Sequence, residues 1–247
     1  MGKLAEQYAK SYNLLLDGNR NVFFIDILLD ELKAHPNAVV ADIGCGAGIA
    51  RSTGYLGGIK ELSGRMIGIE PDTSMQPPKE FFDEVQYCFF EDCTLAPGSV
   101  SFAYSSMVME HVAKPDLFMK KMYEVLQPGG TYIFITVNKN HYFTWFARFF
   151  KKIKSDEAIL NMAKGKEEVA EYHYPLAYKI NDEKAINDIA MRCGFEKPAF
   201  IYAEFAGTKA YFPGPFKFLW NIFTFKRKII KKNNKLLSLI CILKKPM

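Results

Sequence analysis

The chain has 247 residues, of which 49% are hydrophobic and 24% are charged, and its formal net charge is +5. This composition is typical of a globular protein and excludes a disordered or collagen-like chain. The length allows one α/β domain over residues 1–247, with a sizeable core and insertions. No apolar run reaches the roughly eighteen residues of a membrane-spanning helix, and residues 1–7 lack the apolar core of a signal peptide.

The five cysteines are scattered along the chain without a CxxC pair. Such spacing suits a reducing cytoplasm and argues against both a disulfide framework and a zinc site. We therefore expect a cytoplasmic protein without a bound metal.

The charge is distributed unevenly. Residues 139–154 carry five Lys or Arg and residues 217–247 carry nine, and neither segment has an acid. The rest of the chain holds 18 of the 32 basic residues against all 27 acidic ones, a net charge of −9. The two basic segments are also rich in aromatic residues, so they require an explanation of their own.

Taken in chain order, apolar residues first recur at helical spacing, which predicts an N-terminal helical segment over residues 1–34. Strands and helices then alternate. The predicted strands are 39–43, 66–69, 85–90, 100–105 and 131–137, and the predicted helices lie between Gly48 and Gly64 and over 115–126. This alternation predicts a Rossmann-like, doubly wound and mostly parallel sheet with helices on both faces.

The alternation breaks after residue 138. An aromatic and basic segment over 139–179 is expected to form a small cap insertion. A helix over 181–193 and a strand over 200–205 follow, and a basic amphipathic insertion over 211–236 precedes a last strand over 237–243. The predicted sheet therefore has seven strands.

The segment from Val39 to Gly48 combines a short apolar strand, an acid and three glycines that alternate with small residues. Glycine turns of this kind bring bare backbone close to a nucleotide, although the pattern GxGxG alone also occurs in ordinary loops. The order of the acids strengthens the interpretation. Asp42, Glu70 and Asp92 end three successive strands, and the ends of parallel strands share one rim of a sheet.

These motifs resemble those of the class I S-adenosylmethionine-dependent methyltransferases, in particular the family related to ubiquinone and menaquinone C-methyltransferases. Val40–Gly48 is similar to the first motif of that family, Ile67–Asp72 to the second and Glu91–Leu95 to the third. Glu110-His111-Val112 and Leu126–Gly130 match later landmarks, whereas Gly98–Tyr104 lacks the acid of the usual GSFD segment. The resemblance covers residues 35–140, and more loosely the stretch to 205.

The resemblance implies that S-adenosylmethionine (SAM) is the cofactor. Glu70 would hold the ribose hydroxyls, with an exposed strand-end carboxylate as the alternative, and Asp92 would accept from the adenine amino group, with a helix cap as the alternative. Met75 and Phe90 are candidates for packing on adenine or for the core. The full set of expected cofactor-binding residues is Asp42, Gly44, Cys45, Gly46, Gly48, Glu70, Pro71, Met75, Asp92, Cys93 and Ser106. A nicotinamide site is disfavoured, because Ile49 stands where GxGxxG requires its third glycine.

Two histidines are candidate general bases. His111 follows the fourth predicted strand at the rim, and the imidazole of histidine can take up a proton near neutral pH. His173 lies in the Tyr-rich stretch 171–178, where relatives carry a substrate lid. A purely structural role is the alternative for both residues.

The methyl acceptor is not specified by a motif. The absence of an Asn-Pro-Pro-Tyr tetrad argues against amide or exocyclic amino nitrogens and favours a hydroxyl, a carboxylate or an activated carbon. Aromatic residues among lysines suit a helix in an anionic membrane interface, so the basic segments 139–154 and 211–236 favour peripheral contact with the inner face of a membrane and a lipid, quinone or lipid-linked sugar as acceptor. Nucleic acid binding and a solvated lysine face are the alternatives for these segments. A small polar acceptor, or an inactive SAM-binding adaptor, are the alternatives for the chain.

Overall fold

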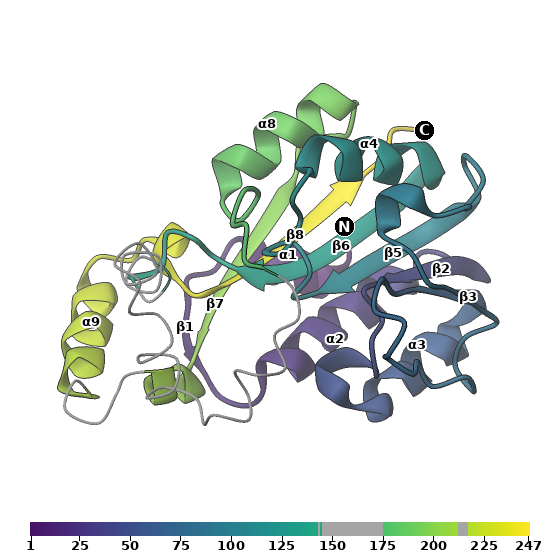
Figure 1. Ribbon diagram of the computed structural model, residues 1–247. Helices are drawn as coiled ribbons and strands as arrows, with labels where there is room; N and C mark the ends of the chain where they lie inside the picture. Colours follow the sequence, from purple (N-terminus) through teal and green to yellow (C-terminus); the bar gives the residue numbers. More distant parts are fainter. Residues whose placement is uncertain (143, 145–174, 212–216) are drawn as a thin grey trace.

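The computed structural model describes residues 1–142, 144, 175–211 and 217–247 (Figure 1). These residues form one eight-stranded sheet in the order β1-β7-β8-β6-β5-β2-β3-β4. The strands are β1 (Asn13–Leu16), β2 (Ala38–Ile43), β3 (Ser63–Ile69), β4 (Glu84–Gln86), β5 (Val100–Ser106), β6 (Leu126–Val137), β7 (Ala199–Phe205) and β8 (Ser238–Lys244). Only β8 runs antiparallel to its neighbours, β6 and β7, whereas every other pair is parallel.

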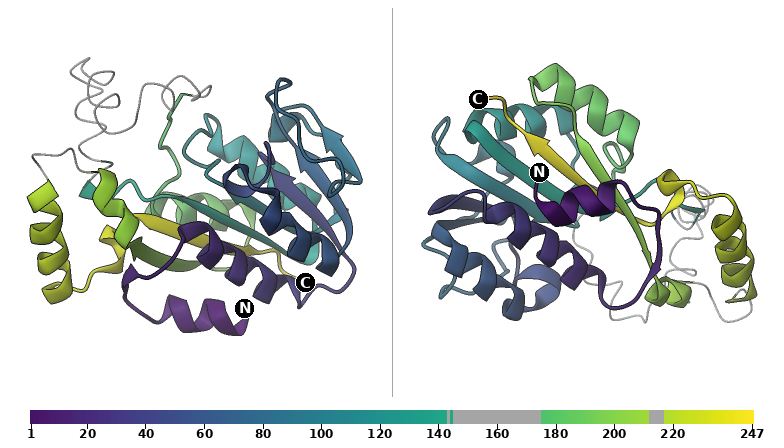
Figure 2. Two further views of the ribbon diagram at one scale, coloured as in Figure 1. Left: turned by 90° about the horizontal axis from the view of Figure 1, so that it is seen from below. Right: turned by 180° about the vertical axis from the view of Figure 1, so that it is seen from behind.

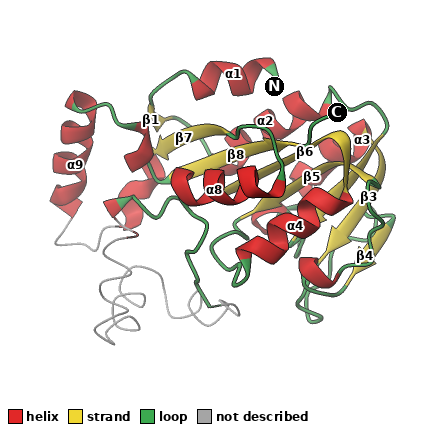
Figure 3. Cartoon of the chain, turned by 90° about the horizontal axis from the view of Figure 1, so that it is seen from above, coloured by secondary structure: helices red, strands yellow, loops and turns green. Residues whose placement is uncertain are grey.

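Helices cover both faces of the sheet (Figures 1 and 3). The described helices are α1 (Lys3–Ala9), α2 (Arg20–Leu32), α3 (Leu56–Leu62), α4 (Pro115–Val125), α8 (Glu183–Cys193) and α9 (Lys217–Ile229). One hydrophobic cluster joins α4 and α8 to the sheet, and a second joins α1, α2 and α3 to the opposite face. The Rossmann-like, doubly wound arrangement predicted from the sequence is confirmed, with eight strands in place of seven.

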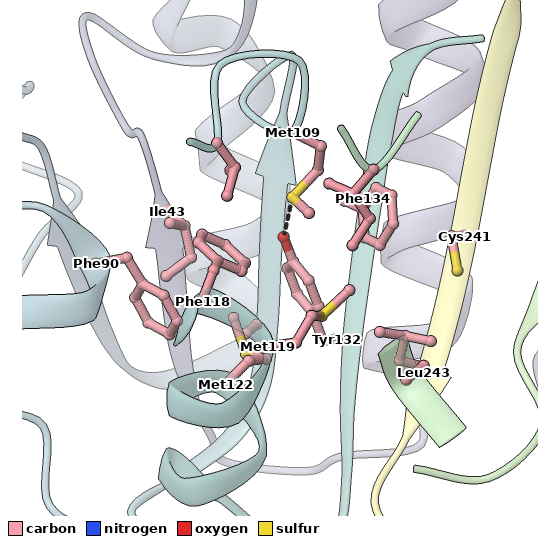
Figure 4. Packing of buried hydrophobic residues seen from close by; sticks show 14 of the residues in the cluster. Ile43, Phe90, Met109, Phe118, Met119, Met122, Tyr132, Phe134, Cys241 and Leu243 are labelled. Carbon is pink, nitrogen blue, oxygen red and sulfur yellow. Dashed lines mark hydrogen bonds between the residues drawn. The ribbon is translucent and has the colours of Figure 1, made fainter. Parts of the chain in front are cut away.

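The central strand β6 shows why both faces are apolar. Tyr132 and Phe134 belong to the cluster under α4 and α8, and Ile133 and Ile135 belong to the cluster on the other face. Figure 4 shows Tyr132 packed beside Phe118, with its hydroxyl donating to the sulfur of Met109 at 3.3 Å. Because a parallel strand is covered on both sides, an uninterrupted apolar run is required there.

The additional strand is β1, and it corrects the prediction of continuous helix over 1–34. Asn13 pairs with Ala203 of β7 and Leu16 with Phe205, so β1 extends the edge of the sheet. The side chain of Asn13 donates to the backbone oxygen of Tyr8 at 3.0 Å, just beyond the end of α1. The apolar run 14–16 therefore forms an edge strand between α1 and α2, and helical periodicity alone could not reveal the change.

Two other elements are shorter than predicted. The strand expected over 85–90 is β4, with only three residues, and Phe90–Asp92 forms a 3-10 turn instead. This turn places the Phe90 ring in the core, 4.8 Å between centroids from that of Phe118. The helix expected after Gly48 begins with two 3-10 turns and becomes α3 only at Leu56.

The later elements follow the sequence closely. Asp182 caps α8 by accepting from the backbone of Ala185 at 2.9 Å, and Gly194 ends the helix in the left-handed conformation. Part of the insertion before the last strand is helix α9, which stands apart from the layers beyond the β1–β7 side of the sheet (Figure 2). Most of the predicted cap over 139–179 lies outside the described residues.

Candidate active site

The carboxyl ends of β2, β3 and β5 meet at one rim of the sheet, where they surround a cavity of about 760 Å³. Ligand pockets range over roughly 300–1,000 Å³, so this volume suits a small molecule. Eight of the predicted cofactor-binding residues line it: Gly44, Gly46, Gly48, Glu70, Pro71, Met75, Asp92 and Ser106. His111 lines the same cavity.

The glycine turn after β2 bends back over the end of β3. The backbone nitrogens of Gly44 and Cys45 both donate to the carbonyl oxygen of Ile69, at 2.7 and 3.3 Å. Gly48 has φ +96°, and a Cβ on it would lie 2.8 Å from the carbonyl oxygen of Ser52. Gly46 has φ +45°, and the nearest atom to a Cβ there would be 3.9 Å away. The turn therefore needs glycine at 48 to close, whereas at 46 it leaves open space toward the cavity.

Glu70 joins the end of β3 to this turn. One carboxylate oxygen accepts from the backbone nitrogen of Gly46 and the other from that of Asp72, both at 2.9 Å. The side chain lines the cavity although Glu70 is only 6% exposed. Because each carboxylate oxygen has a second lone pair, Glu70 can still accept hydrogen bonds from two vicinal hydroxyls.

Asp42 at the end of β2 and Cys45 within the glycine turn do not line the main cavity. They border a small void of about 30 Å³ that they share with Gly44, Gly48 and Ser106. The hydroxyl of Tyr104 on β5 donates to Asp42 at 2.7 Å. Burial raises the pKa of Asp42 to about 7, a rise that the Tyr104 hydrogen bond opposes and the charge of Glu70 reinforces. The protonation of Asp42 is therefore sensitive to a charge placed near the glycine turn.

Cys93 differs from its expected place. Its side chain is 4% exposed and packs in the cluster that joins α4 to the sheet, so its sulfur does not face the cavity. Burial also raises the pKa of this thiol. The other members of this cluster are apolar, and a cysteine thiol is readily buried among such residues.

The acidic end of the cavity is bordered by apolar side chains. Asp92 is exposed at the end of the Phe90–Asp92 turn, and its backbone nitrogen donates to the carbonyl oxygen of Phe89 at 2.9 Å. Phe89 and Leu117 line the same cavity although they are 57% and 51% exposed. An aromatic ring can stack on a flat base, and a carboxylate beside it can accept a hydrogen bond from the amino group of that base. The sequence analysis missed Phe89, whose only signal is its place two residues before the third motif, Glu91–Leu95.

His111 lies in the loop after β5, where its backbone nitrogen donates to the carbonyl oxygen of Val108 at 2.9 Å. The neighbouring Glu110 points the other way and accepts from the hydroxyl of Thr136 on β6 at 2.8 Å. Burial raises the pKa of Glu110. The carbonyl oxygen of Glu110 accepts from Ala177 and Tyr178, so the chain after the cap is tied to this loop. His173 lies outside the described residues.

Arg20, at the start of α2, is a cavity residue that sequence reasoning missed. Its Nε atom is buried and has no hydrogen-bond partner in the described part of the chain. A buried donor without a partner is costly, so this guanidinium is suited to a carboxylate on a bound molecule. The helical periodicity of α2 gave no sign of it, because Arg20 lies at the helix end and not on the apolar stripe.

These residues fit the cofactor that the motifs imply. The ribose diol matches the Glu70 carboxylate, the amino acid carboxylate matches the buried Arg20 donor, and the sulfonium charge suits a rim rich in acids. The cofactor supplies an activated methyl group on a sulfonium, so neither a metal nor a covalent intermediate with the protein is required.

Comparison with known proteins supports the same family. A family model described as a methyltransferase domain matches residues 16–196. A ubiquinone biosynthesis O-methyltransferase from Rattus norvegicus is 34% identical over 112 residues, which are 40% of this chain and 31% of that protein. A 37.1 kDa protein from a Streptomyces fradiae transposon is 33% identical over 110 residues, 42% of this chain and 31% of that one. The matches therefore span less than a third of these two relatives.

Solved structures share the fold. A phosphoethanolamine N-methyltransferase from Haemonchus contortus, in complex with phosphomonomethylethanolamine and S-adenosylhomocysteine, has a TM-score of 0.58 at 16% identity and covers 98% of this chain and 56% of that one. A SAM-dependent methyltransferase from Methanosarcina mazei has a TM-score of 0.52 at 15% identity, with 86% and 94% covered.

The family model covers most of the chain, and the glycine turn, Glu70 and the open parallel sheet agree with it. The chain therefore belongs to the class I SAM-dependent methyltransferases, and SAM is its cofactor.

Proposed function

We propose that this methyltransferase acts on a hydroxyl, a carboxylate or an activated carbon of a lipid, a quinone or a lipid-linked sugar. The observation that carries the proposal is the composition of the cavity wall. Beyond the acids, the wall continues over Met107, Val108, Val112 and Leu117. An apolar wall next to the donor site suits an acceptor with an apolar body.

The donor is held at three points in this proposal. Glu70 accepts the ribose hydroxyls, Asp92 accepts from the adenine amino group, and Arg20 pairs with the amino acid carboxylate. The glycine turn gives the backbone room to approach. Binding at both ends fixes the direction of the methyl group, and an in-line displacement depends chiefly on that alignment.

His111 is the proposed general base. For a hydroxyl acceptor, the imidazole takes the O–H proton as the oxygen forms its bond to the methyl carbon. The bond from that carbon to sulfur breaks at the same time, and the electron pair stays on sulfur as a neutral thioether. The loop that carries His111 borders the apolar wall, so this base and the proposed acceptor share one part of the cavity.

The rat relative is a ubiquinone biosynthesis O-methyltransferase, and this likeness supports a hydroxyl on a quinone-type acceptor. The basic segments 139–154 and 211–236 support a cytoplasmic location at the inner face of a membrane. Within 139–154, however, the described lysine is engaged, because Lys139 pairs with Asp182. The second segment therefore contributes more to this part of the proposal.

Incubation with SAM labelled in its methyl group, together with lipid and aqueous extracts supplied separately, tests the acceptor class. We expect label in the organic phase, and loss of most of it in a His111→Ala variant that still binds SAM. Label confined to water-soluble products would instead favour a small polar acceptor. SAM binding without transfer to either extract would favour an adaptor role.

A further inference from the structure

Helix α9 has one face that is buried and one face that exposes large apolar side chains. Trp220, Thr224 and Arg227 are buried against the body of the protein. Phe218, Ile222, Phe225 and Ile229 are 57%, 54%, 67% and 67% exposed. At 100° per residue these four side chains fall within about 60° of one another, on the side opposite the buried residues. We call these four residues the α9 stripe.

Lysines flank the stripe on both sides. On the same helical wheel, Lys226 lies about 70° to one side of the stripe and Lys228 about 90° to the other. Both are exposed, as are Lys231 and Lys232 just beyond the helix. Residues 205–247 contain no acid. The surface around the stripe is therefore positive, and no carboxylate from this segment offsets it.

The helix is also fixed in orientation. Arg227 pairs with Glu204 of β7, and His141 lies 3.1 Å from the same carboxylate oxygen. The Arg227 guanidinium is 4.6 Å from the centre of the Tyr142 ring, and that ring stacks on Phe223 with centroids 4.4 Å apart. These buried contacts hold one face of α9 on the body and direct the stripe outward.

We propose that the α9 stripe docks on an anionic lipid bilayer, with the helix lying in the membrane interface. In the described part of the chain no helix is long and apolar enough to span a membrane, and α9 with 13 residues is about 20 Å long. Exposed aromatic and aliphatic side chains flanked by lysines are the features of an interfacial helix. Helix α9 lies beyond the β1–β7 side of the sheet (Figures 1 and 2), and the four stripe residues are exposed there.

The charge pattern favours this occupant over others. Anionic lipid headgroups complement the lysines, and acyl chains complement the stripe between them. A second copy of this chain would bring two positive surfaces together. Nucleic acid would engage the lysines but leave the aliphatic residues Ile222 and Ile229 without a role. The inference deepens the lipid-acceptor part of the proposed function. Only the role of docking, which is to bring the enzyme to a lipid acceptor, rests on that proposed function.

Vesicle flotation of the full chain tests the inference without any methyl donor. We expect binding to phosphatidylcholine vesicles that contain phosphatidylserine and much less binding to pure phosphatidylcholine. A Phe225→Ser/Ile229→Ser variant should lose at least tenfold in partition, whereas Met191→Ser, which removes one apolar side chain at a half-exposed site on α8, should not. Lys226→Gln/Lys228→Gln should lose about fivefold per lysine at low salt, and Lys197→Gln should lose none.

SAM binding, measured on every variant, confirms that each is folded and keeps this test separate from the activity assay. Equal partition of the stripe variant and the native chain would overturn the proposal. So would sedimentation showing that the native chain forms a dimer that the stripe variant cannot form, because the stripe would then be a protein interface. Failure of methyl transfer to lipids, with vesicle binding intact, would contradict the proposed acceptor and leave membrane docking standing.

Discussion

The carboxylate of Glu70 accepts a hydrogen bond from the backbone of Gly46, with 2.9 Å between Oε2 and the nitrogen. This contact joins two motifs that lie 24 residues apart. It connects the end of β3 to the glycine turn after β2, so the acid proposed to bind the ribose is positioned by the same backbone that is proposed to make room for the cofactor. Substitutions at the two positions should therefore have related but separable effects.

Replacing Glu70 by Gln should weaken SAM binding, because a charged acceptor is lost from hydrogen bonds to the ribose. Hydrogen bonds to charged groups contribute about 1.5–3 kcal/mol, so we expect the Kd to rise by roughly ten- to a hundredfold. Isothermal titration measures the change. Glu80→Gln, at an exposed acid away from the cavity, is the matched control. An unchanged Kd for Glu70→Gln would contradict the ribose role.

Alanine at Gly46 and at Gly48 should act differently. At Gly48 a Cβ would lie 2.8 Å from the Ser52 carbonyl oxygen, so Gly48→Ala should lower the melting temperature strongly. At Gly46 the added carbon meets nothing closer than 3.9 Å, and only the positive φ costs stability, by about 1–2 kcal/mol. Gly46→Ala should remain folded but lose SAM affinity. Thermal melts with and without SAM distinguish the two, and similar unfolding in both variants would refute the distinction.

Periodicity explains which parts of the fold were predictable. Strands β2 and β6 contain apolar runs that are buried on both faces of the sheet, and such runs leave little choice of structure. β1 was missed because Leu14–Leu16 continues an apolar series that suits a helix equally well, and only its pairing with β7 decides the outcome. The end of the predicted strand 85–90 was missed because packing of Phe90 on Phe118 is a tertiary contact.

The pKa of Asp42, raised by burial to about 7, makes stability depend on pH. The unfolded carboxyl ionises near pH 4, so below that value both states are protonated and Asp42 has no effect. As the pH rises to 7 only the unfolded state loses its proton readily, and the native state loses stability by about 4 kcal/mol from this group. Asp42→Asn should therefore gain stability over the native protein between pH 4 and 7, as urea unfolding would show.

SAM binding should oppose this effect, because its positive charge above the turn favours the ionised form of Asp42. Binding near pH 6 should therefore release a proton, and SAM affinity should rise with pH up to about 7. Calorimetry in buffers of different ionisation enthalpy measures the proton. The same release in Asp42→Asn would assign the proton to another group.

His111 should matter for transfer and little for donor binding. Removal of a general base lowers kcat by typically 10²–10⁴-fold, whereas the contacts proposed for SAM come from other residues. We expect His111→Ala to keep its SAM Kd and to lose kcat. Loss of SAM binding in step with activity would show that the histidine is structural.

The site residues that could be predicted from the sequence are those that belong to a sequence motif. Glu70 and the glycines are constrained by backbone geometry, so their spacing shows in the sequence. Arg20 and Phe89 reach the cavity from a helix end and a short turn. Whether these two side chains reach the cavity depends on how α2 and the Phe90–Asp92 turn pack against the sheet. This packing cannot be predicted from the local sequence.

Arg227 offers a test of the buried contacts that hold α9. Burial alone would raise the pKa of Glu204, but its hydrogen bond to His141, the charge of His141 and the charge of Arg227 keep that pKa below its ordinary value. Removing one partner of a buried ion pair leaves an uncompensated charge and costs about 3–5 kcal/mol. Arg227→Ala should destabilise the protein by that amount in urea unfolding.

Arg192→Ala is the matched control. Arg192 pairs with Asp116 at 2.6 Å on the surface, where the side chains are 60% and 71% exposed. Such surface pairs contribute less than about 1 kcal/mol. Similar losses of unfolding free energy in both variants would show that the stability of the protein does not depend on the buried contacts of Arg227. A large loss confined to Arg227→Ala would show that the positive charge beside Glu204 is part of the fold, because the same arginine-to-alanine change on the surface removes comparable side-chain atoms.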